Sequence, residues 1–183
     1  MAETSASRPP LFVDLDGTLI RADTLVLSLR QLAGKRPDVC LLLPFLLLRG
    51  RAVLKARVAR FVFLDPKDLP YREDVLAFLR EEKSRGRTLV LATAAHIRVA
   101  QAVADHLGLF DGVIATDDSH NLKGASKLAA ILRDAPSGVF DYVGDSEADL
   151  PIFRRAREAI LVRPSSRLLA RARETCTVGR ILD

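Results

Sequence analysis

Two acidic pairs give this sequence its clearest potential for chemistry. Asp14 and Asp16 stand two residues apart in "LFVDLDGTLI", directly after an apolar run, and Asp145 and Asp149 stand four apart in "YVGDSEADLP". Residues two apart in an extended segment point to the same face, so Asp14 and Asp16 can both reach one site. Two carboxylates that share a site repel each other unless a cation intervenes. A hard cation such as Mg²⁺ favours oxygen ligands and would leave one carboxylate free to carry a proton.

The two residues that follow the first pair suit a turn. Gly17 lets the chain turn tightly after the apolar run. We expect the hydroxyl of Thr18 to hydrogen-bond to the backbone of that turn and hold it.

A threonine and two lysines are candidates for binding an anion. Thr93 lies in "LVLATAAH", and its hydroxyl with the amides that follow, beginning at Ala94, can hold an anion where a helix opens. In isolation, Thr93 would be read as a simple helix N-cap. Lys123 and Lys127 in "NLKGASK" offer positive charge for a phosphate, although a loop lysine is usually solvated. These residues indicate an anion-binding site only in combination with the acidic pairs.

Short apolar strands must position these side chains. Helical patterns separate the strands, over Tyr71–Arg85, around Val99–Leu107 and around Leu128–Leu132. This alternation predicts an α/β fold with a Rossmann-like parallel sheet and helices on both faces. In such sheets ligands bind beyond the carboxyl ends of the strands, and Asp14, Thr93 and Asp145 each follow a predicted strand directly. The predicted strands are the segment ending at Phe12–Val13, Thr88–Ala92, Gly112–Ala115, Phe140–Val143 and Ala159–Val162.

The region from Ile20 to Pro70 contains helical stripes and no good strand. Leu25, Leu29 and Leu32 form one stripe, with Asp23 as a plausible N-cap. We interpret residues 20–70 as a small helical cap inserted after the first strand, and residues 1–19 and 71–183 as the core domain.

The cap also carries most of the positive charge. Residues 21–60 contain nine Lys or Arg and two acids, a net charge of +7 in a chain whose total is +5. The uncharged run Val39–Leu48 lies between basic residues and is too short to cross a bilayer. One interpretation is a membrane-proximal, anionic partner surface. The other is a solvated surface whose leucines pack the cap against itself or a second copy.

Composition bounds the remaining function classes. The chain of 183 residues lacks Trp and has 5% aromatic residues, so we expect no nucleic-acid partner. The first ten residues lack the apolar core of a signal peptide. Cys40 and Cys176 fit no metal-ligand spacing and are expected to be reduced thiols. Together these features favour a cytoplasmic protein with membrane-surface contact through the cap as an option, and they indicate no oligomeric state.

Four motifs together resemble the haloacid dehalogenase (HAD) superfamily of phosphohydrolases, in its phosphoserine-phosphatase-like branch. They occur in the order of that family, as "DLDGTL", "LATAA", "NLKG" and "VGDSEADLP". The resemblance implies a nucleophile at Asp14 and a general acid/base at Asp16. It also implies Mg²⁺ as cofactor, held by Asp14, by the backbone carbonyl of Asp16 and by Asp145.

The same resemblance assigns the remaining site residues. Thr93, Ala94 and Lys123 would bind the transferring phosphoryl group, and Asp149 would support either the metal shell or the lysine. Lys123 is preferred to Lys127 because its "KG" step looks like the corresponding segment of phosphoserine phosphatases.

Longer stretches, including "RADTLVLSLRQL" and "HLGLFDGVIATDDSHNLKGASK", look like a domain fused ahead of membrane prenyltransferases of the 4-hydroxybenzoate polyprenyltransferase type. The leading interpretation is therefore a Mg²⁺-dependent phosphomonoester hydrolase acting through an aspartyl-phosphate, on a phosphosugar or a lipid-linked phosphosugar. The alternatives are a phosphotransferase of the same superfamily and a non-catalytic docking domain for a membrane prenyltransferase.

Overall fold

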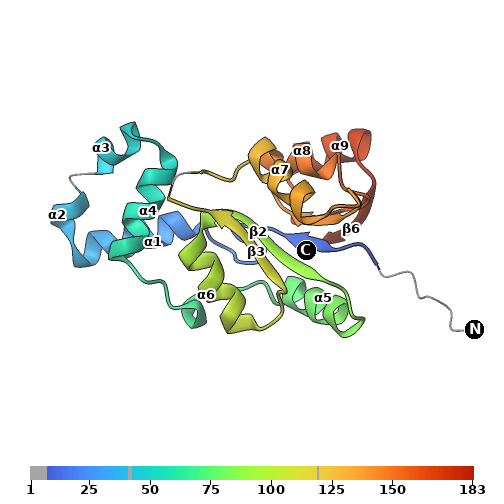
Figure 1. Cartoon of the computed structure of the whole chain (residues 1–183), viewed down its shortest axis with the longest axis horizontal. Helices are drawn as coiled ribbons and strands as arrows, with labels where there is room; N and C mark the ends of the chain where they lie inside the picture. The colour runs from blue at the N-terminus through green and yellow to red at the C-terminus, as the bar shows by residue number, and fades with distance from the viewer. Residues whose placement is uncertain (1–7, 41–42, 119) are drawn as a thin grey trace, which may run out of the picture.

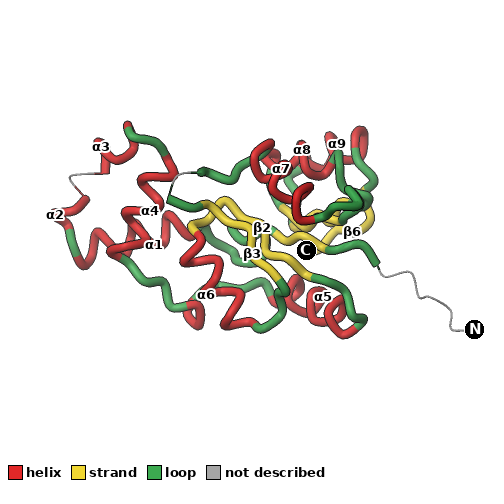
Figure 2. Tube along the Cα trace, viewed as in Figure 1, coloured by secondary structure: helices red, strands yellow, loops and turns green. Residues whose placement is uncertain are grey.

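The computed structural model describes residues 8–40, 43–118 and 120–183, and its centre is a parallel β-sheet. Its strand order is β3-β2-β1-β4-β5-β6, and every neighbouring pair runs parallel. Figure 2 shows these strands as one yellow layer among helices. The predicted α/β class is confirmed. The strands are β1 (Leu11–Val13), β2 (Leu89–His96), β3 (Gly112–Thr116), β4 (Asp141–Gly144), β5 (Ala159–Val162) and β6 (Val178–Leu182).

Alternating apolar side chains let each central strand bury both of its faces. Leu11 and Val13 of β1 belong to one hydrophobic cluster, and Phe12 between them belongs to the other. All three side chains are completely buried. A strand buried on both faces reads as a continuous apolar run, which is why such short segments could be recognised in the sequence.

Helices cover both faces of the sheet, as Figure 1 shows. The cluster with Leu11 takes in α5 (Glu73–Ser84) and α6 (Ile97–Leu107). The cluster with Phe12 takes in α7 (Ala125–Asp134), α8 (Leu150–Phe153) and α9 (Ser166–Thr175). The crossovers between parallel strands thus place α5 and α6 on one side and α7 to α9 on the other.

Two features of the sheet differ from the sequence prediction. β6 was not predicted, because Val178–Leu182 includes Gly179 and Arg180 and lies at a solvent-exposed edge, where the apolar signal is weak. β2 continues to His96, four residues beyond its predicted end. α6 consequently begins at Ile97, and His96 is its N-cap because its Nδ1 accepts from the backbone N–H of Arg98.

The region inserted after β1 contains α1 (Thr24–Lys35), α2 (Pro37–Cys40), α3 (Leu43–Leu48) and α4 (Arg51–Phe61), at one end of the molecule in Figure 1. The predicted N-cap is confirmed, because Asp23 Oδ1 accepts from the N–H groups of Leu25 and Val26. A short 3₁₀ helix, η1 (Pro66–Asp68), precedes the return to the sheet, where Ile20 and Tyr71 form an antiparallel bridge. These helices have a hydrophobic cluster of their own, with Leu32, Val39, Leu54, Val58 and Val62 buried.

The uncharged run of the cap falls on α2, α3 and two residues, 41 and 42, that lie outside the described part of the chain. Phe45, Leu47 and Leu48 of α3 are 68%, 52% and 86% exposed, so these three do not form the cap's core. Across the described residues, no helix has the length and apolar character that crossing a membrane requires.

A buried ion cluster stabilises the opposite edge of the sheet, where the strands begin. Asp141, completely buried at the start of β4, accepts from Arg87, from Arg157 and from the backbone N–H of Glu158. Arg87 also donates from Nη1 to Oε2 of the buried Glu82, at 2.7 Å. Removing one member of such a cluster leaves an uncompensated charge in the interior.

We predict that Asp141→Ala lowers the free energy of unfolding by about 3–5 kcal/mol, because the buried Arg87 then loses one of its two acidic partners and keeps only Glu82. Urea unfolding monitored by circular dichroism measures the loss. The control is Arg157→Gln, which removes a partner of Asp141 that is 45% exposed and should cost much less. Equal losses in the two variants would contradict the assignment of Arg87–Asp141 as the buried member of this cluster.

Candidate active site

A pocket of about 420 Å³ lies beyond the carboxyl ends of β1, β2 and β4. The backbone N–H of Asp14 donates to the carbonyl of Val143 at 3.0 Å, which ties the end of β1 to β4. Aspartates of the two acidic pairs therefore meet, as the strand-end argument predicted. The pocket is lined by core residues that include Asp14, Asp16, Asp145 and Asp149, and by Leu47, Leu54 and Lys55 of the cap.

Asp14 lies at the floor of this pocket and is nearly buried. Lys127 Nζ is 3.1 Å from Asp14 Oδ1, an ion-pair distance, and that oxygen accepts no hydrogen bond from the described residues. Burial raises the pKa of Asp14 to about 7, and Lys127 opposes this rise. The carboxylate is thus poised to receive further positive charge.

Lys127 is itself held in a buried network. Its Nζ donates to Asp149 Oδ1 at 3.1 Å and to Tyr142 Oη at 2.8 Å, and Tyr142 donates in turn to Asp149 Oδ1 at 2.9 Å. Ser146 Oγ donates to the second oxygen of Asp149. Burial alone would lower the pKa of Lys127, but Asp14 and Asp149 raise it above its ordinary value. Lys127 is therefore a fixed ammonium ion against Asp14.

Tyr142 and Lys123 have surroundings that differ from those expected from the sequence. Tyr142 appeared only as an apolar strand residue, whereas its hydroxyl lies in the buried network. Lys123 is exposed at the wall of the pocket, and its backbone N–H donates to Ser126 Oγ. Thus Lys127, the alternative to the preferred Lys123, is the lysine in contact with Asp14.

Asp16 faces the first turn of the cap. Its Oδ1 accepts from the backbone N–H of Thr24 at 2.9 Å, and its Oδ2 accepts from the Thr24 hydroxyl at 3.2 Å. Burial raises the pKa of Asp16 to about 6, against the effects of Thr24 and Lys55. A carboxyl group with this pKa is well suited to exchange protons near neutral pH.

Thr18 and Gly17 bring the first and last motifs together. The buried Thr18 hydroxyl donates to Asp145 Oδ1 at 2.9 Å, so the expectation that it would hold the backbone of its own turn was wrong. Gly17 has a φ of +79°, and a Cβ there would lie 2.2 Å from Asp145 Oδ2. Glycine is therefore required both by backbone conformation and by the close approach of Asp145.

Thr93 and Ala94 lie within β2 rather than after it. Thr93 is completely buried, and its Oγ1 accepts from the backbone N–H of Ala95 at 3.0 Å. Ala94 lines the pocket, and its carbonyl accepts from Thr116 Oγ1 and from Lys55 Nζ. Sequence reasoning missed Lys55 as a site residue, since nothing local in "RAVLKARVA" indicates that this one basic residue turns inward.

An oxygen-ligand cluster is present on the core side of the pocket. Asp14, Asp145 and Asp149 offer carboxylate oxygens that lie within 4.8 Å of one another. Burial raises the pKa of Asp145 as well as that of Asp14. Buried carboxylates at this spacing, with an oxygen of Asp14 lacking a hydrogen bond, suit a divalent cation that prefers oxygen ligands.

Comparisons with known proteins agree with this geometry. The family model of the haloacid dehalogenase-like hydrolases matches residues 11–154. The uncharacterized protein y4nM of Sinorhizobium fredii (strain NBRC 101917 / NGR234) is 39% identical over 174 residues, which cover 95% of this chain and 34% of that protein. The chain therefore spans about a third of the length of this curated relative.

Two solved structures share the fold. Phosphoserine phosphatase in its apo form superposes with a TM-score of 0.66 at 19% identity, covering 96% of this chain and 93% of that one. A phospho-aspartyl intermediate analogue of phosphoserine phosphatase gives a TM-score of 0.62 at 18% identity, with coverage of 96% and 93%. With its family match over residues 11–154 and the site at the carboxyl ends of its strands, this chain belongs to the haloacid dehalogenase-like hydrolases.

Proposed function

We propose that this chain is a Mg²⁺-dependent phosphomonoester hydrolase that acts through an aspartyl-phosphate on Asp14. The observation that carries the proposal is the buried Asp14 carboxylate, in contact with Lys127 at the floor of a pocket that Asp16 also lines. Membership of a hydrolase family supports it, as does a shared fold with a phosphatase seen with a phospho-aspartyl analogue.

The proposed reaction has two steps. In the first, an oxygen of Asp14 attacks phosphorus and the bond from phosphorus to the ester oxygen breaks, while Asp16 donates its proton to the departing alkoxide. In the second, Asp16 takes a proton from a water molecule that attacks the same phosphorus, which releases inorganic phosphate and restores Asp14. The pKa of Asp16 near 6 allows it to serve as the acid in one step and the base in the other.

Asp14, Asp145 and the backbone carbonyl of Asp16 would hold the metal ion, with Asp149 supporting the site through Lys127. When bound, Mg²⁺ supplies positive charge that offsets the repulsion between Asp14 and the phosphate oxygens. Thr18 fixes the carboxylate of Asp145 by its hydrogen bond.

Lys127, in place of Lys123, is the lysine that we assign to the phosphoryl group. It is buried, fully charged and already in contact with Asp14, whereas Lys123 is exposed. Thr93 and the backbone of Ala94 would bind the remaining phosphoryl oxygens at the end of β2. Residues 20–70 would form a cap that excludes water from the pocket, and residues 1–19 and 71–183 the core domain.

Metal removal tests the proposal directly. We predict that chelation abolishes hydrolysis of 4-nitrophenyl phosphate and that added Mg²⁺ restores it. Asp145→Asn should raise the Mg²⁺ concentration for half-maximal activity by more than about tenfold, because one charged ligand becomes neutral. The control Asp105→Asn changes an exposed acid on α6 and should leave this concentration unchanged. Full activity after exhaustive chelation would overturn the role of the metal.

The two lysines allow a matched comparison. We predict that Lys127→Met lowers kcat by about 100- to 1,000-fold, the usual effect of losing one donor to the transition-state oxyanion. Lys123→Met should change kcat by less than about threefold, because an exposed charge contributes little interaction energy. Steady-state kinetics on folded protein, checked by circular dichroism, measures both. The reverse ranking would return the role to Lys123.

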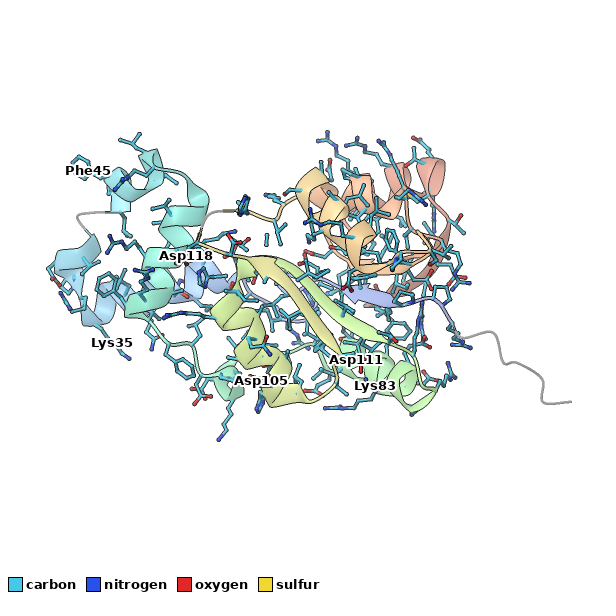
Figure 3. All side chains as sticks on the ribbon, viewed as in Figure 1. Lys35, Phe45, Lys83, Asp105, Asp111 and Asp118 are labelled. Atoms are coloured by element: carbon cyan, nitrogen blue, oxygen red, sulfur yellow. The ribbon has the colours of Figure 1, made fainter. Side chains whose placement is uncertain are left out.

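The apolar lining of the pocket and the exposed apolar residues of α3 suggest a class of substrate. Leu25, Leu47 and Leu54 line the pocket on the cap side, which suits a leaving group with an apolar portion. Phe45, labelled in Figure 3 at the far end of the cap, is exposed together with Leu47 and Leu48. We propose a phosphosugar or a lipid-linked phosphosugar as substrate, presented by a membrane surface on which the cap rests.

An exposed basic residue beside these apolar ones supports the membrane proposal. Arg49 follows α3 directly and is exposed, and a basic residue near an anionic membrane surface contributes about 1 kcal/mol.

We predict salt-sensitive binding of the chain to vesicles of anionic phospholipid. Phe45→Ser with Leu48→Ser should abolish co-sedimentation, because the cap then has less apolar surface to insert. Val139→Ser removes an apolar residue of the core domain that is 43% exposed, and should have no effect. Failure of the wild-type chain to sediment with anionic vesicles at low salt would contradict the proposed membrane contact.

A further inference from the structure

Near its carboxyl end, the backbone of β2 is held partly by a side chain from outside the sheet. The register between β2 and β3 shifts between Ala92 and His96, so the regular ladder is interrupted where the chain passes the pocket. Within this interruption, the Ala94 carbonyl accepts from Thr116 Oγ1 at 2.8 Å and from Lys55 Nζ at 2.6 Å. Thr116 belongs to the neighbouring strand, but Lys55 comes from helix α4 of the cap.

The peptide group between Ala94 and Ala95 is thereby fixed at both ends. Its carbonyl is held by Lys55 and Thr116, and its N–H donates to Thr93 Oγ1 at 3.0 Å. A hydrogen bond from an ammonium group is stronger than one between neutral groups. The orientation of this peptide, at the wall of the proposed phosphate site, thus depends in part on a side chain from the cap.

Lys55 also reaches the loop that leads into α7. Its Nζ lies 3.1 Å from Asn121 Oδ1, and the carbonyl of Asn121 accepts from Ser126 Oγ in the first turn of α7. Lys127 follows Ser126 directly and contacts Asp14. One ammonium group of the cap therefore bridges the β2 end and the loop before the catalytic lysine.

A second contact on α4 supports the same arrangement. Arg60 Nη2 donates to Asp118 Oδ2 at 2.9 Å, and Asp118 Oδ1 lies 3.1 Å from Nε2 of the buried His96. Asp118 is labelled in Figure 3, where it lies between α4 and the ends of β2 and β3. Lys55 and Arg60 thus each make a polar contact at or just beyond the ends of these two strands.

We infer that Lys55 is a positioning residue that fixes the backbone of β2 at Ala94, where the proposed phosphate site lies. This inference rests on the proposed function and deepens it. Phosphoryl binding then depends on a side chain of α4 as well as on the core strands. Lys55 would act on the reaction through the Ala94 peptide and not by touching the leaving group.

Kinetics with inorganic phosphate distinguishes this role from recognition of the leaving group. Phosphate has no leaving group, so a lysine that binds the leaving group does not affect it. We expect Lys55→Met to raise the inhibition constant of inorganic phosphate by about 10- to 100-fold, the usual effect of losing one charge-assisted hydrogen bond. The same factor should appear in kcat/KM for 4-nitrophenyl phosphate and for phosphoserine, whose leaving group carries a carboxylate.

Two variants serve as controls. Lys55→Arg keeps a charged donor and should restore part of the lost phosphate affinity. Arg57→Met removes an exposed positive charge from the same helix and should leave all three constants at their wild-type values. Circular dichroism and thermal melting confirm that each variant is folded.

Different results would overturn the inference on Lys55 and the proposed function. A loss confined to phosphoserine, with the inhibition constant of phosphate unchanged, would overturn the inference and make Lys55 a receptor for the leaving group. An active wild type with an unaffected Lys55→Met variant would overturn it as well. A wild type that neither hydrolyses phosphate esters nor binds phosphate would overturn the proposed function itself, and this inference with it.

Discussion

The charge balance around Asp14 is the constraint on which the rest of the structure depends. Four aspartates line one pocket, Asp14, Asp16, Asp145 and Asp149, and burial raises the pKa of at least the first three. Such a group of carboxylates is destabilising unless positive charge is placed among them. Lys127 provides part of that charge from the folded chain, and its own position is fixed by Asp149 and Tyr142.

The fold satisfies this constraint by bringing together segments that are far apart in sequence. The carboxyl ends of β1 and β4 deliver Asp14 and Asp145, and the Thr18 hydroxyl joins the two motifs directly. Gly17 gives Asp145 the space to approach. The cap contributes to the same site through Thr24, which holds Asp16, and through Lys55, which holds the carbonyl of Ala94. Asp16 and the backbone at Ala94, the proposed acid/base and part of the proposed phosphate site, therefore both have hydrogen-bond partners in the inserted helices.

The sequence predicted the class of fold and the convergence of the acidic pairs, because both follow from regular rules. Apolar strands alternating with helices imply a parallel sheet, and parallel strands end at the same edge. The edge strand β6 was not predicted because Gly179 and Arg180 interrupt its apolar pattern. The extension of β2 to His96 was missed because "TAAH" has the small and polar residues of a turn.

Contacts between side chains that are far apart in the chain could not be predicted from the sequence, for a physical reason. The choice between Lys123 and Lys127 depends on where α7 begins and which of its faces meets β4, and a motif fixes neither. Lys55 lies 39 residues from Ala94, and its inward direction is set by how α4 packs on the strand ends. Thr18 shows the same limit, since its partner Asp145 is 127 residues away.

The central claim is that Asp14 becomes covalently phosphorylated during turnover. The most direct measurement is mass spectrometry of peptides from enzyme that is acid-quenched during steady-state hydrolysis of 4-nitrophenyl phosphate with Mg²⁺. The account predicts a phosphoryl group on Asp14 in the wild type, and no phosphorylated aspartate and no turnover in Asp14→Asn. Turnover by Asp14→Asn, or a phosphoryl group trapped on another residue of the wild type, would contradict the account.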